Sequence, residues 1–234
     1  MSEQTPLAHH SMYRITARLV TYLHESVTES FGDEAKTLIR KGTESFGLAR
    51  AKSIAERARR EGEEHILFDY VSESEQPTTE KLDDQVIYPW MATWFAQIAK
   101  QVVDQFGEQG KDAIREGVRR FGLQRGENIA NRAEHLGYDN TIEHYLSNYD
   151  MGRSDLFEFD TTIHAENIDQ TFTKCPFGQQ WADENMHEYG ILYCEMIDPS
   201  IAKGYNKDFE VDHPKFILKE GVCQFDFKLK RKTQ

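Results

Sequence analysis

A thiol and a carboxylate stand four residues apart near the end of the chain, at Cys194 and Asp198. The pattern predicts one helix over about 179–198, and on a helix this spacing puts both side chains on one face, about one turn apart. His187 lies about two turns before Cys194 on the same face, and Asp183 precedes His187 by about one turn. Cysteine usually packs as a small apolar residue, so a cysteine among His and Asp side chains indicates chemistry.

Two chemical roles fit these residues. A Cys194 thiolate can act as a nucleophile, because the deprotonated form is the one that attacks. Asp198 can serve as a general acid or base, and His187, oriented by Asp198 or Asp183, can accept the thiol proton. Seven residues of helix separate His187 from Cys194 by about 10 Å, so a substrate or a water fits between them better than a direct hydrogen bond. The plainer interpretations are a surface histidine at His187 and, at Asp198, a carboxylate that ends the helix before Pro199.

The other two cysteines are Cys175 and Cys223. Eighteen residues separate Cys175 from Cys194, and 28 residues separate Cys194 from Cys223. Zinc sites typically have about two to four residues between their first two ligands, so the spacing predicts no metal. If the fold assembled the three thiols, a Cys-ligated metal would become an alternative. Simple packing is the other alternative, and it fits Cys223 best.

A further candidate is Asn206, which follows Gly204 and Tyr205. In a loop after the helix, its amide can lie over the helix end and contact a substrate. The plainer interpretation is turn formation, in which Asn side chains commonly bond to nearby backbone.

Part of the helical pattern of the first 150 residues occurs twice. Residues 31–62 and 106–137 align at an offset of 75, and 15 of the 32 aligned positions are identical. Phe31-Gly32 and the matching Phe106-Gly107 each predict the end of a helix, because Gly is the favoured residue after one. The sequence therefore predicts two copies of a helix pair of roughly 50 residues, which form a pseudo-symmetric four-helix layer. The second helix of the first copy is expected over about 33–60.

Matched glycines and arginines recur inside the second helix of each copy. Glycine is about 1 kcal/mol less favourable than alanine inside a helix, so we expect the matched glycines to let another helix approach closely. The arginines form either an ion-paired, solvated face or a clamp for a substrate carboxylate. The glycines are Gly42, Gly47, Gly117 and Gly122, and the arginines are Arg40, Arg50, Arg57, Arg115, Arg125 and Arg132.

Alternating apolar and polar residues after position 150 predict strands. In chain order we expect a strand over 156–168, a turn at 175–178, the helix over 179–198 that Pro199 stops, a loop over 204–214, a short strand at 216–218 and a final strand over 222–229.

These elements predict an α+β fold. A duplicated N-terminal helix-pair layer, all α, packs on a small C-terminal domain of antiparallel strands that flank a helix. The expected boundaries are 1–75 for the first helix-pair repeat, 85–150 for the second, and 151–234 for the α+β domain with the candidate active site.

Composition limits the partners. A net charge of −12 argues against non-specific binding to nucleic acid or to an anionic membrane. The sequence has no apolar run near the roughly 18 residues of a membrane span, and residues 1–10 lack a secretory pattern. Three cysteines make no disulfide framework. We expect a cytoplasmic protein with a small-molecule substrate, no nucleic-acid or membrane partner and no cofactor; a homo-oligomer is compatible with the sequence.

The motifs over residues 85–229 resemble the L-2-amino-thiazoline-4-carboxylic acid hydrolase family. The resemblance rests on Cys-x-x-x-Asp at 194–198, on Asn206, on Gly-x-Cys-x-Phe at 221–225, and on upstream motifs at 110–117 and 121–125. It implies hydrolysis at a carbon–nitrogen bond of a small cyclic amidine or amide, as in opening a thiazoline ring to N-carbamoyl-L-cysteine. The chain departs from this pattern in carrying the N-terminal helix pair twice.

For the site, the resemblance implies an attack by Cys194, or by water activated at Asp198, on the electrophilic ring carbon. A cation must hold the ring carboxylate, and Arg115 or Arg125 could supply it. The expected substrate-binding set is completed by Tyr205, Cys175 and Cys223. The alternatives are a non-catalytic small-molecule-binding or sensor module and a Cys-ligated metal enzyme.

Overall fold

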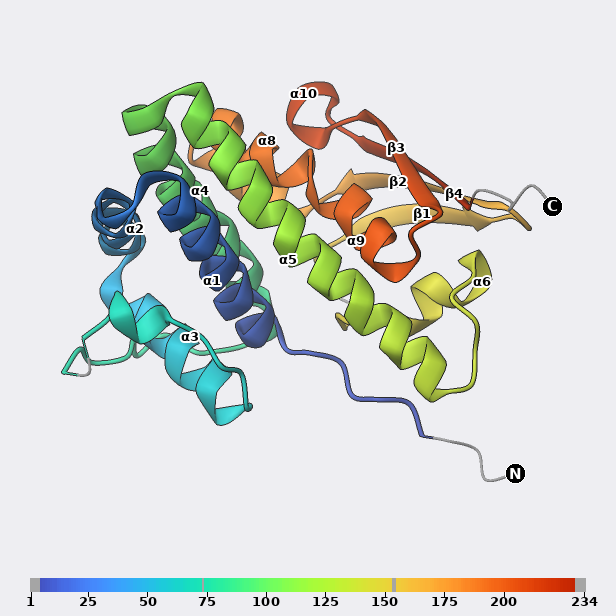
Figure 1. Cartoon of the computed structure of the whole chain (residues 1–234), viewed down its shortest axis with the longest axis horizontal. Coiled ribbons are helices and arrows are strands. Elements are labelled where there is room, and N and C mark those ends of the chain that lie inside the picture. The colour runs from blue at the N-terminus through green and yellow to red at the C-terminus, as the bar shows by residue number, and fades with distance from the viewer. Residues whose placement is uncertain (1–4, 73, 153–154, 230–234) are drawn as a thin grey trace. The chain divides into compact units, whose positions relative to one another are not determined.

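The computed structural model describes residues 5–72, 74–152 and 155–229. The protein is α+β, as predicted, with a mostly helical N-terminal region and a four-stranded antiparallel sheet near the C-terminus (Figure 1). The chain forms two compact units, each discontinuous in sequence. The helical unit comprises Ser11–Val118 and Pro176–Tyr193; the sheet unit comprises Met1–His10, Arg119–Cys175 and Cys194–Gln234. The division at 75, 85 and 150 stays a prediction.

The helical unit contains the helices of residues 12–118, with only the start of α5, and two later helices. Gly32 (φ 63°) ends α1 and Gly107 (φ 58°) ends α4, which confirms both Phe-Gly stops. The helices of this unit are α1 (Met12–Phe31), α2 (Asp33–Phe46), α3 (Leu48–Arg60), the 3-10 helix η1 (Leu67–Asp69), α4 (Asp84–Phe106), the start of α5 (Glu108–His135), α7 (Pro176–Asp183) and α8 (His187–Cys194) up to its last residue.

Positions 75 residues apart make corresponding contacts in the helical unit. A methyl group on Gly42 would lie 2.7 Å from the Ile98 Cα, and one on Gly117 would lie 3.1 Å from the Leu23 Cα. Ile98 is itself 75 residues after Leu23. The Phe31 ring stacks on the matching ring of Phe106 at 3.7 Å and 7°. The predicted close helix approach is therefore confirmed at Gly42 and Gly117.

The single helix predicted over 33–60 is wrong, because it breaks at Gly47 into α2 and α3. Gly47 has φ 116° and ψ 115°, a conformation that residues with a side chain rarely adopt. The matching Gly122 lies inside the continuous α5, where a methyl group would come within 2.6 Å of the Ser200 Cβ. One copy uses the glycine for backbone freedom, and the other uses it for space.

The sheet unit is built on four antiparallel strands in the order β1-β2-β4-β3. The final predicted strand is confirmed as β4 (Cys223–Leu229). The strand predicted over 156–168 is wrong, since a turn at 164–166 separates β1 (Glu158–Ile163) from β2 (Asn167–Lys174). The predicted loop 204–214 contains β3 (Phe209–Lys215), and the predicted strand 216–218 is the start of α10 (Ile217–Glu220). Pro214 argues against a strand at this place in the sequence. However, β3 is an edge strand, where proline is tolerated.

The helix predicted over 179–198 is also wrong, because three helices replace it: α7, α8 and α9 (Ile197–Tyr205). Asn185 adopts a left-handed conformation (φ 56°) between α7 and α8, so the two helices cannot be continuous. Pro199 does not stop a helix but lies in the first turn of α9, where no intrahelical N–H is needed from it. Two short helical pieces at 142–148, α6 (Ile142–Tyr145) and η2 (Leu146–Asn148), complete the sheet unit.

The α9 helix lies directly against the second half of α5. A methyl group on Gly204 would lie 2.1 Å from the Leu123 carbonyl oxygen, so backbone meets backbone at this crossing. The same crossing carries Asp198 on α9 and Arg125 on α5. None of the helices among the described residues is both long and apolar enough to span a membrane.

Candidate functional site

Cys194 and Asp198 lie on consecutive helices rather than on one. Cys194 is the last residue of α8 and Asp198 is in the first turn of α9, with a two-residue turn between the helices. The two side chains are close enough for the Asp198 carboxylate to raise the pKa of the Cys194 thiol. The structure thus brings together the two residues that the sequence singles out. A turn between two helices places them close together, rather than a shared face of one helix.

Cys194 is a protonated thiol near neutral pH. Burial raises its pKa well above the ordinary value, and the neighbouring Cys175, Cys223 and Asp198 raise it further. A thiol attacks an electrophile poorly compared with a thiolate. Cys194 therefore needs a base beside it before it can act as a nucleophile.

Asp198 can be that base. Burial raises the pKa of its carboxyl to about 6, while Arg125 opposes the shift. A carboxyl with this pKa is mostly ionised at pH 7 yet holds a proton far better than an exposed aspartate does. The side chain can accept and return a proton in the physiological range.

Arg125 forms an ion pair with another carboxylate of the sheet unit, that of Asp150. Its Nε and Nη2 donate to the two carboxylate oxygens of Asp150 at 3.0 and 2.6 Å. The two side chains are 4% and 0% exposed. Such a bidentate pair is strong and fixes both planes, so the predicted clamp for a substrate carboxylate is already occupied at Arg125.

Arg132 continues this arrangement two turns further along α5. Its Nε donates to the Asn148 carbonyl at 2.9 Å, and its Nη1 donates to the Ala8 carbonyl at 2.8 Å. Seven residues apart on one helix, Arg125 and Arg132 share a face, and together they hold the segment 148–150.

The matching arginines of the first copy make surface contacts. Arg50 pairs with the half-exposed Glu80 at 3.0 Å. Arg57 pairs with Glu61 one turn along α3. The ion-paired face therefore describes Arg50, Arg57 and, in the second copy, Arg115, whereas Arg125 and Arg132 are buried.

Cys175 and Cys223 lie near one end of the sheet. Cys175 directly follows β2, and Cys223 begins β4. The buried Cys223 sulfur accepts a hydrogen bond from the Ile217 N–H at 3.2 Å, and burial raises its pKa to about 12. The simple packing expected for Cys223 describes it well. Within the described ranges, no group of three or more His, Cys, Asp and Glu side chains is arranged to hold a metal ion.

Tyr205 and Asn206 serve the end of α9. The Tyr205 hydroxyl donates to the Thr141 carbonyl at 2.7 Å. The Asn206 amide donates to the Asn140 carbonyl at 2.7 Å, and its oxygen accepts from the Asp208 N–H at 2.9 Å. Turn formation accounts for the contact with Asp208, whereas the contact with Asn140 ties the end of α9 to the segment before α6.

The remaining predicted residues belong to the helical unit. His187 is exposed and begins α8, the helix that Cys194 ends. Asp183 is exposed at the end of α7, where it accepts a hydrogen bond from Gln179. Arg115 pairs with Asp112 one turn earlier at 3.4 Å.

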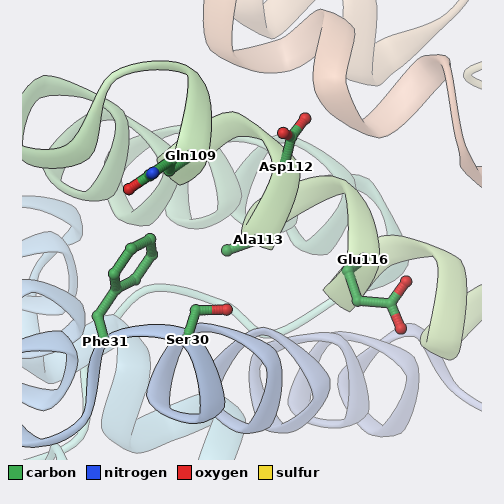
Figure 2. A pocket seen from close by; sticks show the side chains of 6 residues that line it. All are labelled: Ser30, Phe31, Gln109, Asp112, Ala113 and Glu116. Carbon is green, nitrogen blue, oxygen red and sulfur yellow. The ribbon is translucent and has the colours of Figure 1, made fainter.

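A shallow hollow of about 450 Å³ lies in the helical unit between α1 and α5 (Figure 2). None of the predicted site residues lines it. Its lining residues are Ser30, Phe31, Gln109, Asp112, Ala113 and Glu116.

His213 is a site residue that the sequence reasoning missed. Its ring lies 3.8 Å from the Phe216 ring and 4.0 Å from the Phe225 ring. Burial lowers its pKa to about 4, although the backbone of Cys194 and of Lys215 opposes this. The alternation of Phe209, Val211 and His213 along β3 is the sequence signal of a strand that would place His213 with the other two residues on one face.

A family model described as L-2-amino-thiazoline-4-carboxylic acid hydrolase matches residues 88–227. The comparison with curated proteins gave no match. An H-NOX protein from S. oneidensis in the Fe(II)NO ligation state is 10% identical, with a TM-score of 0.40 over 92% of this chain and 99% of that chain. An oxygen-binding H-NOX domain related to soluble guanylate cyclases is 12% identical, with a TM-score of 0.38 over 94% and 97%. At these scores the likeness assigns neither a fold nor a function.

Proposed function

Because the chain belongs to the L-2-amino-thiazoline-4-carboxylic acid hydrolase family, we propose that it opens a small cyclic amidine or amide by hydrolysis. The substrate is a small molecule, and L-2-amino-thiazoline-4-carboxylate is the compound with which to test the activity. Asp198 is the general base, and Cys194 lies beside the reacting carbon.

One observation carries this proposal: a partly buried carboxyl with a pKa of about 6 lies next to a partly buried thiol at the junction of α8 and α9. General bases work best when their pKa lies near the working pH. Proximity of two such groups in a shielded place is typical of catalytic sites more than of surface ion pairs.

The chemistry follows from the ring. Asp198 removes a proton from water as its oxygen bonds to the amidine carbon, and the electron pair of the C=N bond moves to the ring nitrogen, which gains a proton. The tetrahedral adduct then collapses as its C–OH becomes a carbonyl. The carbon–sulfur bond breaks, and sulfur leaves with that electron pair and is protonated. The product is the N-carbamoyl cysteine, and no redox partner is required.

Cys194 permits a second route to the same product. If Asp198 takes the thiol proton instead, the Cys194 sulfur bonds to the ring carbon, the ring carbon–sulfur bond breaks, and the ring sulfur leaves with that electron pair and is protonated. Water then adds to the same carbon, and the Cys194 sulfur leaves with its electron pair and regains a proton as the carbonyl forms. Replacing Cys194 with serine separates the routes. The covalent route loses nearly all activity, whereas the water route keeps most of it.

A non-catalytic binding module is the second candidate, and the protonated state of Cys194 favours it. Such a protein binds the ring compound without turning it over. Calorimetry with the unreacted compound, combined with a turnover assay, distinguishes the two functions.

The test uses the full chain and follows the thiol released from excess L-2-amino-thiazoline-4-carboxylate. Wild type should turn the compound over, and Asp198→Asn should lose at least about 100-fold in kcat, the usual range for a general base. Asp183→Asn, which changes an exposed carboxylate on α7, is the matched control and should keep full activity. Full activity in Asp198→Asn would refute the assignment.

Residues 11–62 lie outside the range matched by the family model. They are the first copy of an internally duplicated helix pair. The corresponding contacts of Gly42 with Ile98 and of Gly117 with Leu23 support this duplication.

A further inference from the structure

The buried Asp150 and the half-buried Asp198 both interact with the Arg125 guanidinium in the sheet unit. Asp150 holds two of the Arg125 donors at 3.0 and 2.6 Å. Asp198 lies at the crossing of α9 with α5, where a methyl group on Gly122 would lie 3.1 Å from the Ile197 carbonyl oxygen and one on Gly126 would lie 2.1 Å from the Ile201 carbonyl oxygen. The positive charge of Arg125 also lowers the pKa of Asp198. Arg125 therefore interacts more strongly with Asp150 than with Asp198.

We infer that Asp150 is a positioning residue for Asp198: by accepting both Arg125 hydrogen bonds, it keeps that cation from forming an ion pair with Asp198. This inference rests on the proposed function of Asp198 as the general base. Asp150 itself touches no substrate in this role.

Asp150 and Asp198 compete for the same guanidinium of Arg125. A cation within about 4–6 Å lowers the pKa of a carboxyl by roughly 1–3 units. A full ion pair with Arg125 would therefore return Asp198 to the range of an ordinary aspartate or below. With the fork directed at Asp150, burial outweighs the attraction of Arg125 at Asp198.

The structure fixes Asp150 in this position from three sides. Its carbonyl accepts the His10 N–H at 2.8 Å, and Arg132 binds the Asn148 carbonyl two residues earlier. The Tyr149 ring lies 5.3 Å from the Arg125 guanidinium, and its hydroxyl shares a hydrogen bond with Arg125. The fork therefore has little freedom to turn from Asp150 toward Asp198.

Besides Arg125 and Asp150, the titratable groups that surround Asp198 are neutral at pH 7. The tyrosines and cysteines around it all have pKa values raised by burial, and His213, on the strand packed against α9, has its pKa lowered to about 4. Only Arg125 and Asp150 in this set are charged. The set is Arg125 from α5, Tyr145 from α6, Tyr149 and Asp150 from the following segment, Cys194 from α8, His213 from β3 and Cys223 from β4.

The test compares two substitutions with opposite predictions. Asp150→Asn keeps the shape but frees Arg125, so the titration midpoint of Asp198 should fall from about 6 by roughly one pH unit. Arg125→Gln removes the cation, so the midpoint should rise. A purely structural role for Asp150 would reduce activity without moving the midpoint.

Two readouts are needed. The first is the acid limb of kcat/KM against pH with L-2-amino-thiazoline-4-carboxylate. The second is the carboxyl ¹³C shift of Asp198 against pH, assigned by its absence in Asp198→Asn, and it requires no turnover. Glu143→Gln, an exposed carboxylate on the neighbouring α6, is the control and should leave both unchanged.

Loss of a buried ion pair can unfold a protein, so Tyr149→Phe provides a milder variant. It removes a hydroxyl bonded to Arg125 and leaves every charge in place, and it should lower the midpoint slightly. If wild type does not turn the compound over but the ¹³C midpoints move as stated, the proposed function fails and the positioning role stands. If Asp198→Asn loses activity but folded Asp150→Asn keeps the wild-type midpoint, the positioning role is refuted.

Discussion

Gly126 on α5 touches the backbone of Ile201 on α9 so closely that a methyl group on Gly126 would lie 2.1 Å from the Ile201 carbonyl oxygen. Gly126 directly follows Arg125, and Ile201 lies one turn after Asp198. Because backbone meets backbone, no side chain can move aside to widen the gap. The crossing of α5 and α9 therefore sets how near Arg125 comes to Asp198.

Gly126→Ala should destabilise the protein by about 1–3 kcal/mol, the usual result of overpacking a tight contact. The added methyl group must push α9 away from α5. Urea unfolding followed by circular dichroism measures the change. Gly152→Ala is the control, since nothing lies within 4 Å of its new methyl group and its φ needs no glycine. Equal stability of Gly126→Ala and Gly152→Ala would contradict the contact.

Local signals predicted the helix ends, but packing decided what happened between them. Phe-Gly ends α1 and α4 because a glycine with positive φ stops a helix within one turn. Gly47 and Gly122 occupy matching positions, yet only Gly47 breaks its helix. The difference comes from Ser200, which crowds Gly122 from a helix almost 80 residues away, and a local pattern cannot contain that information.

The candidate site was predictable to the extent that it is local. Cys194 and Asp198 are four residues apart, so they stay close whether one helix or two helices carry them. Asp150 and His213 reach the site through contacts with residues distant in sequence, Arg125 and Phe225. The positions of Asp150 and His213 depend on which residues share a face of α5 and on the register of β3 with β4. Local sequence patterns do not reveal either of these.

Asp198→Asn should make the protein more stable at pH 7 while it removes activity. The folded pKa of about 6 exceeds the ordinary aspartate value of 3.8, so the folded state holds this proton more tightly than the unfolded state does. Stability from this group is fully present below about pH 4 and is lost as the pH rises to about 6. Asparagine removes that loss, a gain on the order of 1–3 kcal/mol at pH 7. Thermal unfolding at pH 4 and pH 7 measures it, and an equal difference at both pH values would contradict the shift.

Cys194 should react slowly with iodoacetamide in the native protein. Burial raises its pKa, so little thiolate exists at pH 7.5, and we expect alkylation at least about tenfold slower than for a free cysteine. Peptide mass spectrometry resolves the three cysteines, and the unfolded protein supplies the reference rate. Rapid labelling of Cys194 near neutral pH would show a thiolate and would favour the covalent route.

The hollow between α1 and α5 should accept a larger side chain at Ala113, which faces it in Figure 2. At the matching place in the first copy, Leu38 stands where Ala113 does, and Gln105, matching Ser30, donates to Glu34 at 2.8 Å. The hollow is therefore lined by Ser30 and Ala113, which are smaller than the matching Gln105 and Leu38. Ala113→Leu should stabilise the protein by about 0.5–1.5 kcal/mol, as cavity filling commonly does. Leu38→Ala, the converse change at a buried position, should cost about 2–5 kcal/mol. Urea unfolding of both variants measures these changes, and a loss of stability in Ala113→Leu would mean that the walls of the hollow cannot hold the added carbons.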